Sequence, residues 1–225
     1  MSKEKQLVAK ELTKRIKDGE VIGLGSGSTC ELAIKEIGKK IKAEGIKVYG
    51  VPTSKKIANL AKEVGIEILP VSTTKEIVWA FDGADEVDPE FNMIKGRGGA
   101  MLLEKIVAKK ANSYVIIVGE NKLVETLGEK FPIPIEIIAE AEVLVSNQLL
   151  SLGAVEIVLR RTSSNEIYLT DKNNLVLDVR FSKINEELEQ QIKNITGVVE
   201  SGLFFNLADE LLVANEEKVV SRTKK

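Results

Sequence analysis

The chain has 225 residues, with 32 lysines and arginines against 34 aspartates and glutamates, for a net charge of −2 at pH 7. This length predicts one domain, or one with a small companion, and the charge balance gives no indication of a nucleic-acid-binding protein. There is no histidine and only one cysteine, Cys30. Catalytic triads that depend on histidine are therefore excluded, and a typical zinc site is not expected. Any proton transfer near neutral pH must be carried out by a carboxylate, lysine, tyrosine or cysteine.

The sequence also bears on where the protein resides. No apolar run approaches the roughly 20 residues of a membrane span, and the charged first five residues lack the apolar core of a signal peptide. A single cysteine excludes an intrachain disulfide framework and suits a reducing compartment. We expect a cytoplasmic protein without membrane or nucleic-acid partners.

In the first 118 residues, stretches with a helical spacing of apolar residues alternate with short apolar runs typical of buried strands. We expect helices at residues 3–17, 30–42, 55–64 and 99–110, and strands at 20–25, 47–51, 66–71, 77–81 and 114–118. Strand and helix alternating at this spacing predict an α/β fold with a doubly wound, mainly parallel sheet.

After Gly128 the pattern changes, and Phe131-Pro-Ile-Pro134 marks a boundary. The order strand, helix, strand, strand, helix, strand follows, which is typical of a ferredoxin-like α+β module. These elements cover residues 133–138, 141–152, 155–159, a hairpin across 171–174, 186–195 and 198–205. Because a strand at 210–214 can return to the first sheet, we expect a Rossmann-like domain, 1–130 plus 206–225, with an inserted domain, 131–205. The polar tail from Val219 to Lys225 is expected to be frayed.

The loop Gly25-Ser-Gly-Ser-Thr29 joins a predicted strand to a predicted helix. Its amides, hydroxyl groups and helix N-terminus make a phosphate cradle. A dinucleotide fingerprint is absent, because the third glycine position of Gly-x-Gly-x-x-Gly holds Ser28 or Cys30, and the Gly-Lys-Ser/Thr of a Walker A loop is missing. We expect the loop to bind one phosphate of a small molecule, with a purely structural turn as the alternative. Lys122 can add positive charge at the same rim, and the alternative for it is an ordinary surface lysine.

Acidic residues follow the strand predicted at 77–81. Asp82 and Asp85 lie just beyond its carboxyl end, where open α/β sheets bind ligands. Lys95-Gly-Arg-Gly-Gly99 then forms a loop with little side-chain cover that leads into a helix, which suits an anion or a developing oxyanion. Glu104 falls on the shoulder of that helix's apolar stripe, in its second turn, where a carboxylate half out of water can serve as a base.

Each of these features also has a simpler explanation: lone glycines usually mark tight turns, and a lone glutamate in a helix usually lies at the surface. Asp82, Asp85, Glu86 and Asp88 fit a solvated acidic turn, since turns favour aspartate. A metal site at the three aspartates is a further alternative, but their spacing fits no calcium loop, and no metal is expected. The conjunction of acids, a lysine, a glycine-rich loop and a shoulder glutamate within 25 residues favours a catalytic site.

With these residues assembled, the chain resembles the ribose-5-phosphate isomerase type A family. Five stretches carry the resemblance, in the family's order and spacing: Gly25-Ser-Gly-Ser-Thr29, Asp82-Gly-Ala-Asp-Glu86, Lys95-Gly-Arg-Gly-Gly-Ala100, Glu104-Lys105 and Lys130-Phe-Pro-Ile-Pro-Ile-Glu136. The similar layout covers almost the whole chain. The resemblance implies a cofactor-free aldose–ketose isomerase of the non-oxidative pentose phosphate pathway, which interconverts ribose 5-phosphate and ribulose 5-phosphate through an enediolate.

The resemblance also implies roles for individual residues. Glu104 takes the place of the family's general base, and the implied catalytic set includes Asp82, Asp85 and Lys95. The positions implied to bind the phosphosugar are Ser26, Gly27, Ser28, Thr29, Asp82, Gly83, Ala84, Asp85, Lys95, Gly96, Arg97, Gly98 and Lys122. Lys5 matches a further phosphate-binding lysine less securely. Some family members have glycine at the position of Arg97, and several have a polar or basic residue at that of Leu103.

Two other functions stay open on the sequence alone. One is a sugar-phosphate-sensing domain, as in regulators that resemble this superfamily; such proteins normally add a DNA-binding module, for which 225 residues with a net charge of −2 leave little room. The other is an isomerase or transferase of related fold that acts on another phosphosugar or on a thioester. The expected partners are a small phosphosugar and further copies of this chain, as a homodimer or homotetramer.

Overall fold

The computed structural model describes residues 3–224 and divides the chain into two compact units. The first unit comprises the residues up to 84, 103–123 and those from 206 onward, and the second comprises 85–102 and 124–205. The chain therefore leaves the first unit twice and returns to it twice. The domain bounds expected from the sequence, with an insertion at 131–205, differ from these units and stay a prediction.

The first unit is built on a seven-stranded sheet with the strand order β14-β13-β7-β4-β1-β2-β3. Its strands are β1 (Val21–Leu24), β2 (Tyr49–Pro52), β3 (Glu67–Ile68), β4 (Trp79–Asp82), β7 (Tyr114–Gly119), β13 (Glu210–Ala214) and β14 (Val219–Thr223). Every neighbouring pair is parallel except β13 with β14, so the expected mainly parallel sheet is confirmed. The chain builds outward from β1 in both directions, and the order reverses between β1 and β4. In such sheets, ligands bind at the carboxyl ends of the strands beside this reversal.

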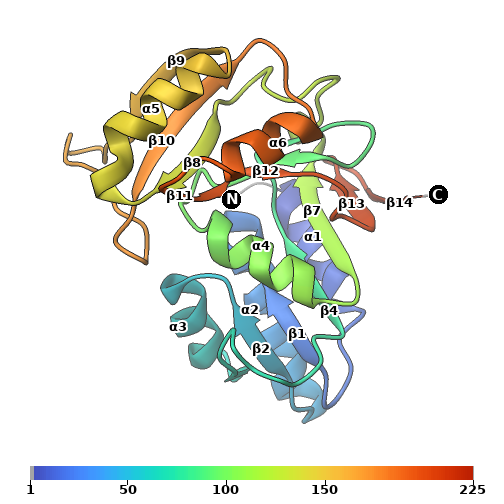
Figure 1. Ribbon diagram of the computed structural model, residues 1–225. Coiled ribbons are helices and arrows are strands. Elements are labelled where there is room, and N and C mark those ends of the chain that lie inside the picture. The colour runs from blue at the N-terminus through green and yellow to red at the C-terminus, as the bar shows by residue number, and fades with distance from the viewer. Residues whose placement is uncertain (1–2, 225) are drawn as a thin grey trace. The chain divides into compact units, whose positions relative to one another are not determined.

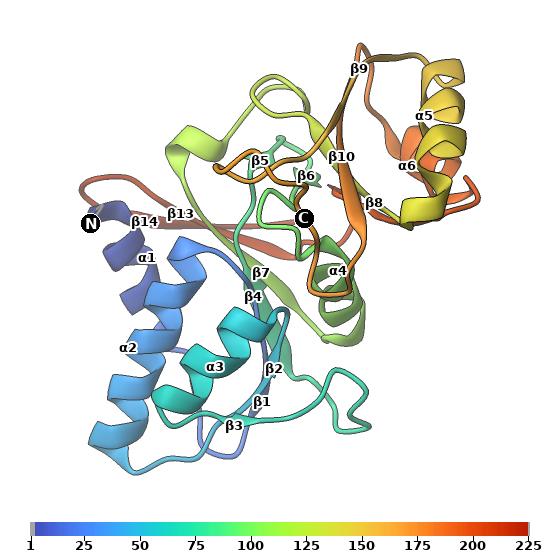
Figure 2. The same cartoon turned by 90° about the vertical axis from the view of Figure 1, so that its left-hand side faces the viewer.

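Helices cover both faces of this sheet, as the doubly wound prediction requires. α1 (Lys3–Thr13), α2 (Ser28–Glu44) and α3 (Lys55–Glu63) lie on one face, and α4 (Met101–Lys110) lies on the other (Figure 2). Alternate side chains of β1 explain the two layers: Ile22 and Leu24 pack into the core with the first three helices. Gly23 faces α4, and a Cβ there would lie 2.5 Å from Val107 Cγ1, so the glycine lets the helix approach the sheet closely.

Several expectations for this unit are wrong in detail. The helix expected at 3–17 ends at Thr13, and the strand expected at 66–71 is only Glu67–Ile68. The C-terminal tail is not frayed as far as it is described, because Val219–Thr223 forms β14 and pairs antiparallel with β13; Lys225 lies outside the described residues. In the turn between the two strands, Asn215 Oδ1 accepts hydrogen bonds from the amides of Glu217 and Lys218. α4 begins at Met101 instead of near Gly99, so Glu104 lies in its first turn and not in its second.

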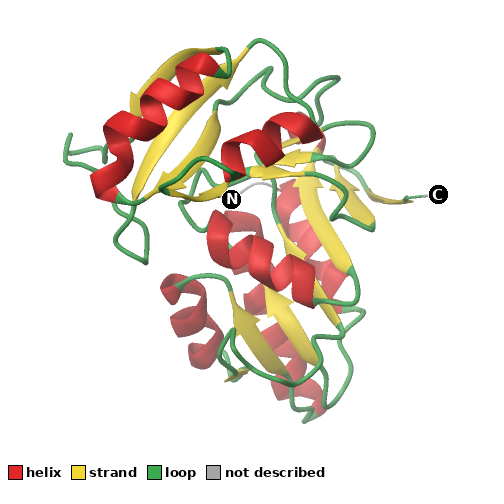
Figure 3. Ribbon diagram, in the orientation of Figure 1, coloured by secondary structure: helices red, strands yellow, loops and turns green. Residues whose placement is uncertain are grey.

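The second unit contains a four-stranded antiparallel sheet with two helices on one face (Figure 3). Its elements are β8 (Ile133–Ile137), the 3₁₀ turn η2 (Ala139–Ala141), α5 (Glu142–Ser151), β9 (Ala154–Leu159), β10 (Leu175–Phe181), α6 (Glu186–Lys193) and β11 (Val198–Ser201). The spatial order β11-β8-β10-β9, together with this chain order, is that of a ferredoxin-like module, as predicted. Apolar residues of β8 and β10 pack with those of α5 and α6 to form its core.

A small three-stranded sheet completes the second unit, in the order β12-β6-β5. Its strands are β12 (Leu203–Phe204), β6 (Met93–Ile94) and β5 (Glu86–Val87). Two-residue strands have no readable periodicity, which is why the sequence did not predict this sheet. Its strand β6 leads directly into the segment that carries Lys95 and the glycines, and Lys95 N donates to Gly202 O at 2.8 Å. Within residues 3–224, no helix is both long enough and apolar enough to cross a membrane.

Candidate functional site

The residues singled out in the sequence divide between the two units, and each group is described within its own unit. In the first unit, the loop after β1 meets the end of β4, its neighbour across the strand-order reversal (Figure 1). Gly25 N donates to Phe81 O at 2.8 Å. A Cβ on Gly25 would lie 2.4 Å from Asp82 Cγ. Only glycine therefore allows the loop to pass directly over this carboxylate.

Asp82 is almost fully buried, with 1% of its surface exposed, at the end of β4. Its Oδ1 accepts hydrogen bonds from Gly83 N at 2.7 Å and Ser26 N at 3.1 Å, and the Cys30 thiol lies 3.7 Å away. Its Oδ2 accepts one from the Tyr114 hydroxyl at 3.2 Å. Several donors thus fix the carboxylate, which excludes the interpretation of Asp82 as part of a solvated turn.

The loop of residues 25–29 has the form expected of an anion cradle. Gly27 adopts a φ of 105° and precedes the first turn of α2, while Gly27 and Ser28 are exposed. The Ser26 hydroxyl, by contrast, is turned to the protein and bonds to Thr53 Oγ1 at 2.8 Å and Ser54 Oγ at 2.9 Å. The N-terminal amides of a helix attract negative charge, so this loop is suited to a phosphate group.

Two lysines of the first unit add positive charge near these elements. Lys5 Nζ of α1 donates to Ser28 Oγ at 2.8 Å, so its ammonium group lies directly at the cradle. Lys122 ends the 3₁₀ turn η1 (Glu120–Lys122), which follows β7. Because β7 runs parallel to β4, Lys122 belongs to the same carboxyl-terminal edge of the sheet as Asp82.

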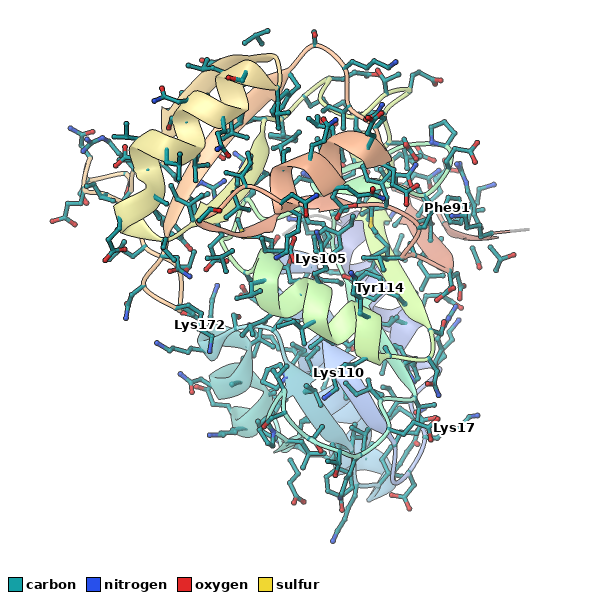
Figure 4. All side chains as sticks on the ribbon, in the orientation of Figure 1. Lys17, Phe91, Lys105, Lys110, Tyr114 and Lys172 are labelled. Carbon is teal, nitrogen blue, oxygen red and sulfur yellow. The ribbon has the colours of Figure 1, made fainter. Side chains whose placement is uncertain are left out.

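Glu104 and Tyr114 are both buried in the first unit. Burial raises the pKa of the Tyr114 phenol well above its usual value, and the negative charges of Asp82 and Glu104 raise it further. The Glu104 carboxylate therefore lies near enough to Tyr114 to influence it through space. Figure 4 labels Tyr114 at the start of β7, and Lys105 and Lys110 on α4.

In the second unit, Asp85 is tied to the glycine loop, defined here as residues 95–99. Asp85 Oδ2 accepts a hydrogen bond from Arg97 N at 3.0 Å, and Asp85 N donates to Ile94 O at 2.8 Å. The backbone turns at Gly96, which has a φ of 95°. Lys95 is buried, and its ammonium group lies 5.5 Å from the centroid of the Phe204 ring.

The other two acids of the candidate turn have structural roles. Glu86 is fully buried and accepts hydrogen bonds from the amides of Gly128, Lys130 and Phe131 at 2.6–2.7 Å. Asp88 accepts from the amide of Asn92 at 2.8 Å and so closes the turn between β5 and β6. The four acids therefore do not form one solvated turn. No group of three or more potential metal ligands gathers anywhere in residues 3–224.

Sequence reasoning missed three side chains that contact these residues. Tyr114 bonds to Asp82, while Arg160 and Tyr168 bond to carbonyl oxygens of the glycine loop. Arg160 and Tyr168 are more than 60 positions away from that loop, and a tyrosine within an apolar strand is indistinguishable from a core residue by pattern. The sequence therefore carried no signal for any of the three.

The chain was compared with known families and structures. The model of the family described as ribose 5-phosphate isomerase A (phosphoriboisomerase A) matches residues 49–218. A ribose-5-phosphate isomerase A of Prochlorococcus marinus is 44% identical over 225 residues, covering 97% of this chain and 95% of the relative.

Two solved structures were also compared with the chain. The ribose 5-phosphate isomerase A of Methanocaldococcus jannaschii superimposes with a TM-score of 0.92 at 43% identity, covering 98% of both chains. A D-ribose-5-phosphate isomerase in complex with phospho-erythronic acid gives 0.93 at 39% identity, covering 98% of this chain and 97% of the other.

Proposed function

The chain belongs to the ribose 5-phosphate isomerase A family and is an isomerase of ribose 5-phosphate and ribulose 5-phosphate, and we propose that Glu104 is its general base. The observation that carries this assignment is the position of Glu104: the residue is 5% exposed and lies in the first turn of α4. Where water is largely excluded, a charged carboxylate interacts more strongly with the charges that develop on the substrate. With no histidine in the chain, a carboxylate is also the natural group for this task.

The reaction requires a proton to move between adjacent carbons. In the open-chain aldose, Glu104 removes the C2 proton, and the electrons of the C–H bond form the C1–C2 double bond of an enediolate. The protonated glutamate then returns the proton to C1, while the O2 hydroxyl proton is lost and O1 gains one, which gives the ketose. General acid–base catalysis of this kind contributes about 10²–10⁴ in rate.

We assign the phosphate to the cradle formed by Ser26, Gly27, Ser28 and Thr29. The exposed amides at the start of α2 and the Lys5 ammonium group on Ser28 support this assignment, and Lys122 supplies further positive charge. A phosphate bound there leaves C1 and C2, at the other end of the sugar, available for the proton transfer. This remote binding energy orients the reacting carbons.

We assign binding of the sugar hydroxyls and of the developing oxyanion to Asp82, Gly83, Ala84, Asp85 and the glycine loop. Asp82 or Asp85 assists ring opening and moves hydroxyl protons, and the Lys95 ammonium group stabilises the enediolate. Gly96, Arg97 and Gly98 form the loop beside the same oxyanion, to which we assign the Gly98 N–H as donor. The hydrogen bond between Arg97 N and Asp85 Oδ2 supports a coupled role for the acid and the loop.

We further propose a cytoplasmic enzyme that needs no metal or cofactor and assembles as a homodimer or homotetramer. Large apolar side chains on α5 and β9 support the assembly: Val143 is 73% exposed, Val155 68% and Leu150 56%. Light scattering tests it, with twice or four times the chain mass expected and a monomer mass contradicting it. Activity that persists in EDTA is expected, and loss of activity there would oppose a metal-free mechanism.

The assignment of Glu104 is tested by Glu104→Gln, which keeps the shape of the side chain and removes its basicity. We expect a fall in kcat of at least about 10³, with phospho-erythronic acid, the ligand of the solved relative, still bound. Glu63→Gln, at the exposed end of α3, is the matched control and is expected to retain wild-type turnover. Near-wild-type turnover by Glu104→Gln would reject the assignment.

A further inference from the structure

We propose that Arg160 and Tyr168 are positioning residues for catalysis, forming a clamp that fixes the peptide planes of the glycine loop. The inference rests on the proposed role of that loop in binding the reacting oxygen. Three successive loop carbonyls are held from outside the loop: Arg160 Nη1 donates to Gly96 O at 2.8 Å and to Arg97 O at 3.0 Å. The Tyr168 hydroxyl donates to Gly98 O at 2.9 Å.

The clamp is itself held rigidly by the ferredoxin-like module. The guanidinium of Arg160 donates from Nε to Asp178 Oδ2 at 2.8 Å, and from Nη2 to Asp178 Oδ1. The backbone joins the same framework, with Arg160 N bonded to Val176 O at 2.9 Å and Tyr168 N to Arg160 O at 3.0 Å. One edge of the guanidinium plane thus faces a carboxylate of β10, and the other faces the loop. Only arginine offers this planar, two-sided arrangement of donors.

Fixing a carbonyl also fixes the amide that follows it. In a trans peptide, the C=O of one residue and the N–H of the next point in opposite directions. The clamp therefore turns the amides of Arg97, Gly98 and Gly99 away from Arg160 and Tyr168. Arg97 N donates to Asp85, and Gly99 N donates to Gly96 O at 2.9 Å. Within residues 3–224, the Gly98 N–H is left as the one of these three amides without an acceptor.

The space around Tyr168 supports the same conclusion independently. Gly99 has a φ of 70°, and a Cβ placed on it would lie 2.3 Å from the Tyr168 hydroxyl oxygen. The tyrosine thus fills the volume that any other residue at position 99 requires, and loop and clamp fit each other closely. A cavity of about 380 Å³ in this unit, lined in part by Asp85, Arg97 and Arg160, lies on the clamp side of the loop.

These observations define what the clamp does. It holds the glycine loop with the Gly98 amide presented to the oxyanion of the enediolate before that charge develops. Preorganised donors of this kind act mainly in the transition state, so loosening them lowers kcat more than it raises KM. A residue needed only for folding would instead lower the amount of active enzyme and leave the behaviour of each folded molecule unchanged.

The first test is Tyr168→Phe, which removes a single hydroxyl group. We expect kcat to fall about 3- to 10-fold with KM unchanged, which corresponds to one neutral hydrogen bond. Binding of phospho-erythronic acid, whose carboxylate tests the oxyanion contacts, should weaken, whereas binding of inorganic phosphate should not. Tyr49→Phe, in β2 of the first unit, is the matched control. A kcat within about twofold of wild type, or equal weakening for both ligands, would overturn the clamp.

The second test is Arg160→Lys, which keeps the charge but cannot bond to Asp178 and to two carbonyls at once. We expect a fall in kcat of about 10², similar to the loss of one oxyanion donor. Arg161→Lys, at the exposed neighbouring arginine, controls for surface charge and should behave as wild type. Should Arg160→Lys fail to fold, the Tyr168 variant alone decides. Unchanged kinetics in a folded Arg160→Lys would refute the proposal.

Failure of the clamp is distinguishable from failure of the proposed function. Glu104→Gln is measured in parallel with the clamp variants. If Glu104→Gln is inactive while Tyr168→Phe and Arg160→Lys are fully active, the base stands and the clamp is wrong. If Glu104→Gln is fully active, the proposed base is wrong, and a selective loss of kcat and phospho-erythronate binding in the clamp variants would still support the clamp.

Discussion

Tyr114 offers a sharp test of how the end of β4 is stabilised. Replacing it with phenylalanine keeps the ring in the core and removes the hydroxyl that donates to the buried Asp82 carboxylate at 3.2 Å. Hydrogen bonds to charged groups contribute about 1.5–3 kcal/mol. We therefore expect Tyr114→Phe to lower the free energy of unfolding by about 2 kcal/mol at pH 8, measured by urea denaturation at fixed protein concentration.

The same variant also predicts a change with pH. Burial and two neighbouring carboxylates raise the pKa of Tyr114 well above its ordinary value near 10. Below pH 10 the phenol is neutral in both the folded and the unfolded chain. Above it, the unfolded chain loses the proton while the folded protein keeps it, so the contribution of this group to stability declines as the pH rises through this range.

The size of this decline follows from linkage. Because the pKa of Tyr114 in the folded protein lies well above its ordinary value, raising the pH from 10 to 11 costs the wild type about 1 kcal/mol through this group. Tyr114→Phe lacks the group, so the stability difference between the two proteins should shrink by that amount. A difference that is equal at pH 8 and pH 11 would contradict the burial argument, and a variant as stable as wild type at pH 8 would show that the 3.2 Å contact contributes nothing.

Three further outcomes are expected. Gly25→Ala places a Cβ 2.4 Å from Asp82 Cγ and should destabilise the protein by about 1–3 kcal/mol, which a thermal melt would detect; an unchanged Tm would contradict the close approach. Lys5→Met removes the ammonium group on Ser28 and should raise KM about tenfold with little change in kcat; a fall in kcat alone would argue against a phosphate-binding role. Glu86→Ala removes the buried carboxylate that three partly buried amides share as acceptor and should cost about 3–5 kcal/mol in urea denaturation, and a loss below about 1 kcal/mol would contradict the anchor.

The main elements were predictable because their periodicity is strong. Ile22 and Leu24, which flank Gly23, follow the pattern of a buried parallel strand. The Asp82-Gly83 break after an apolar run marks the end of a strand at the carboxyl edge of the sheet. Element type was therefore readable, and the order of the second unit's elements fixed its ferredoxin-like topology. The ends of the helices and strands were predicted less accurately than their types, as the later start of α4 shows.

Features that depend on tertiary contacts were not predictable. Glu86 and Asp85 are neighbours in an acidic run, yet one anchors three amides of a distant segment and the other bonds to the glycine loop. Nothing in their local sequence separates these roles. The pairing of Val219–Thr223 with β13 was missed for the same reason, since polar and basic residues at a chain end resemble an unstructured tail until a partner strand is present.

The central claim is that Glu104 carries the proton between C2 and C1, and hydrogen exchange measures this step directly. Purified enzyme is incubated with ribose 5-phosphate in D₂O, and deuterium at C2 of the recovered aldose and at C1 of the ketose is followed by NMR. The account predicts steady incorporation with wild type and Glu63→Gln, and a rate lower by at least about 10³ with Glu104→Gln, although that variant still binds phospho-erythronic acid. Incorporation by Glu104→Gln at a rate near that of wild type would contradict it.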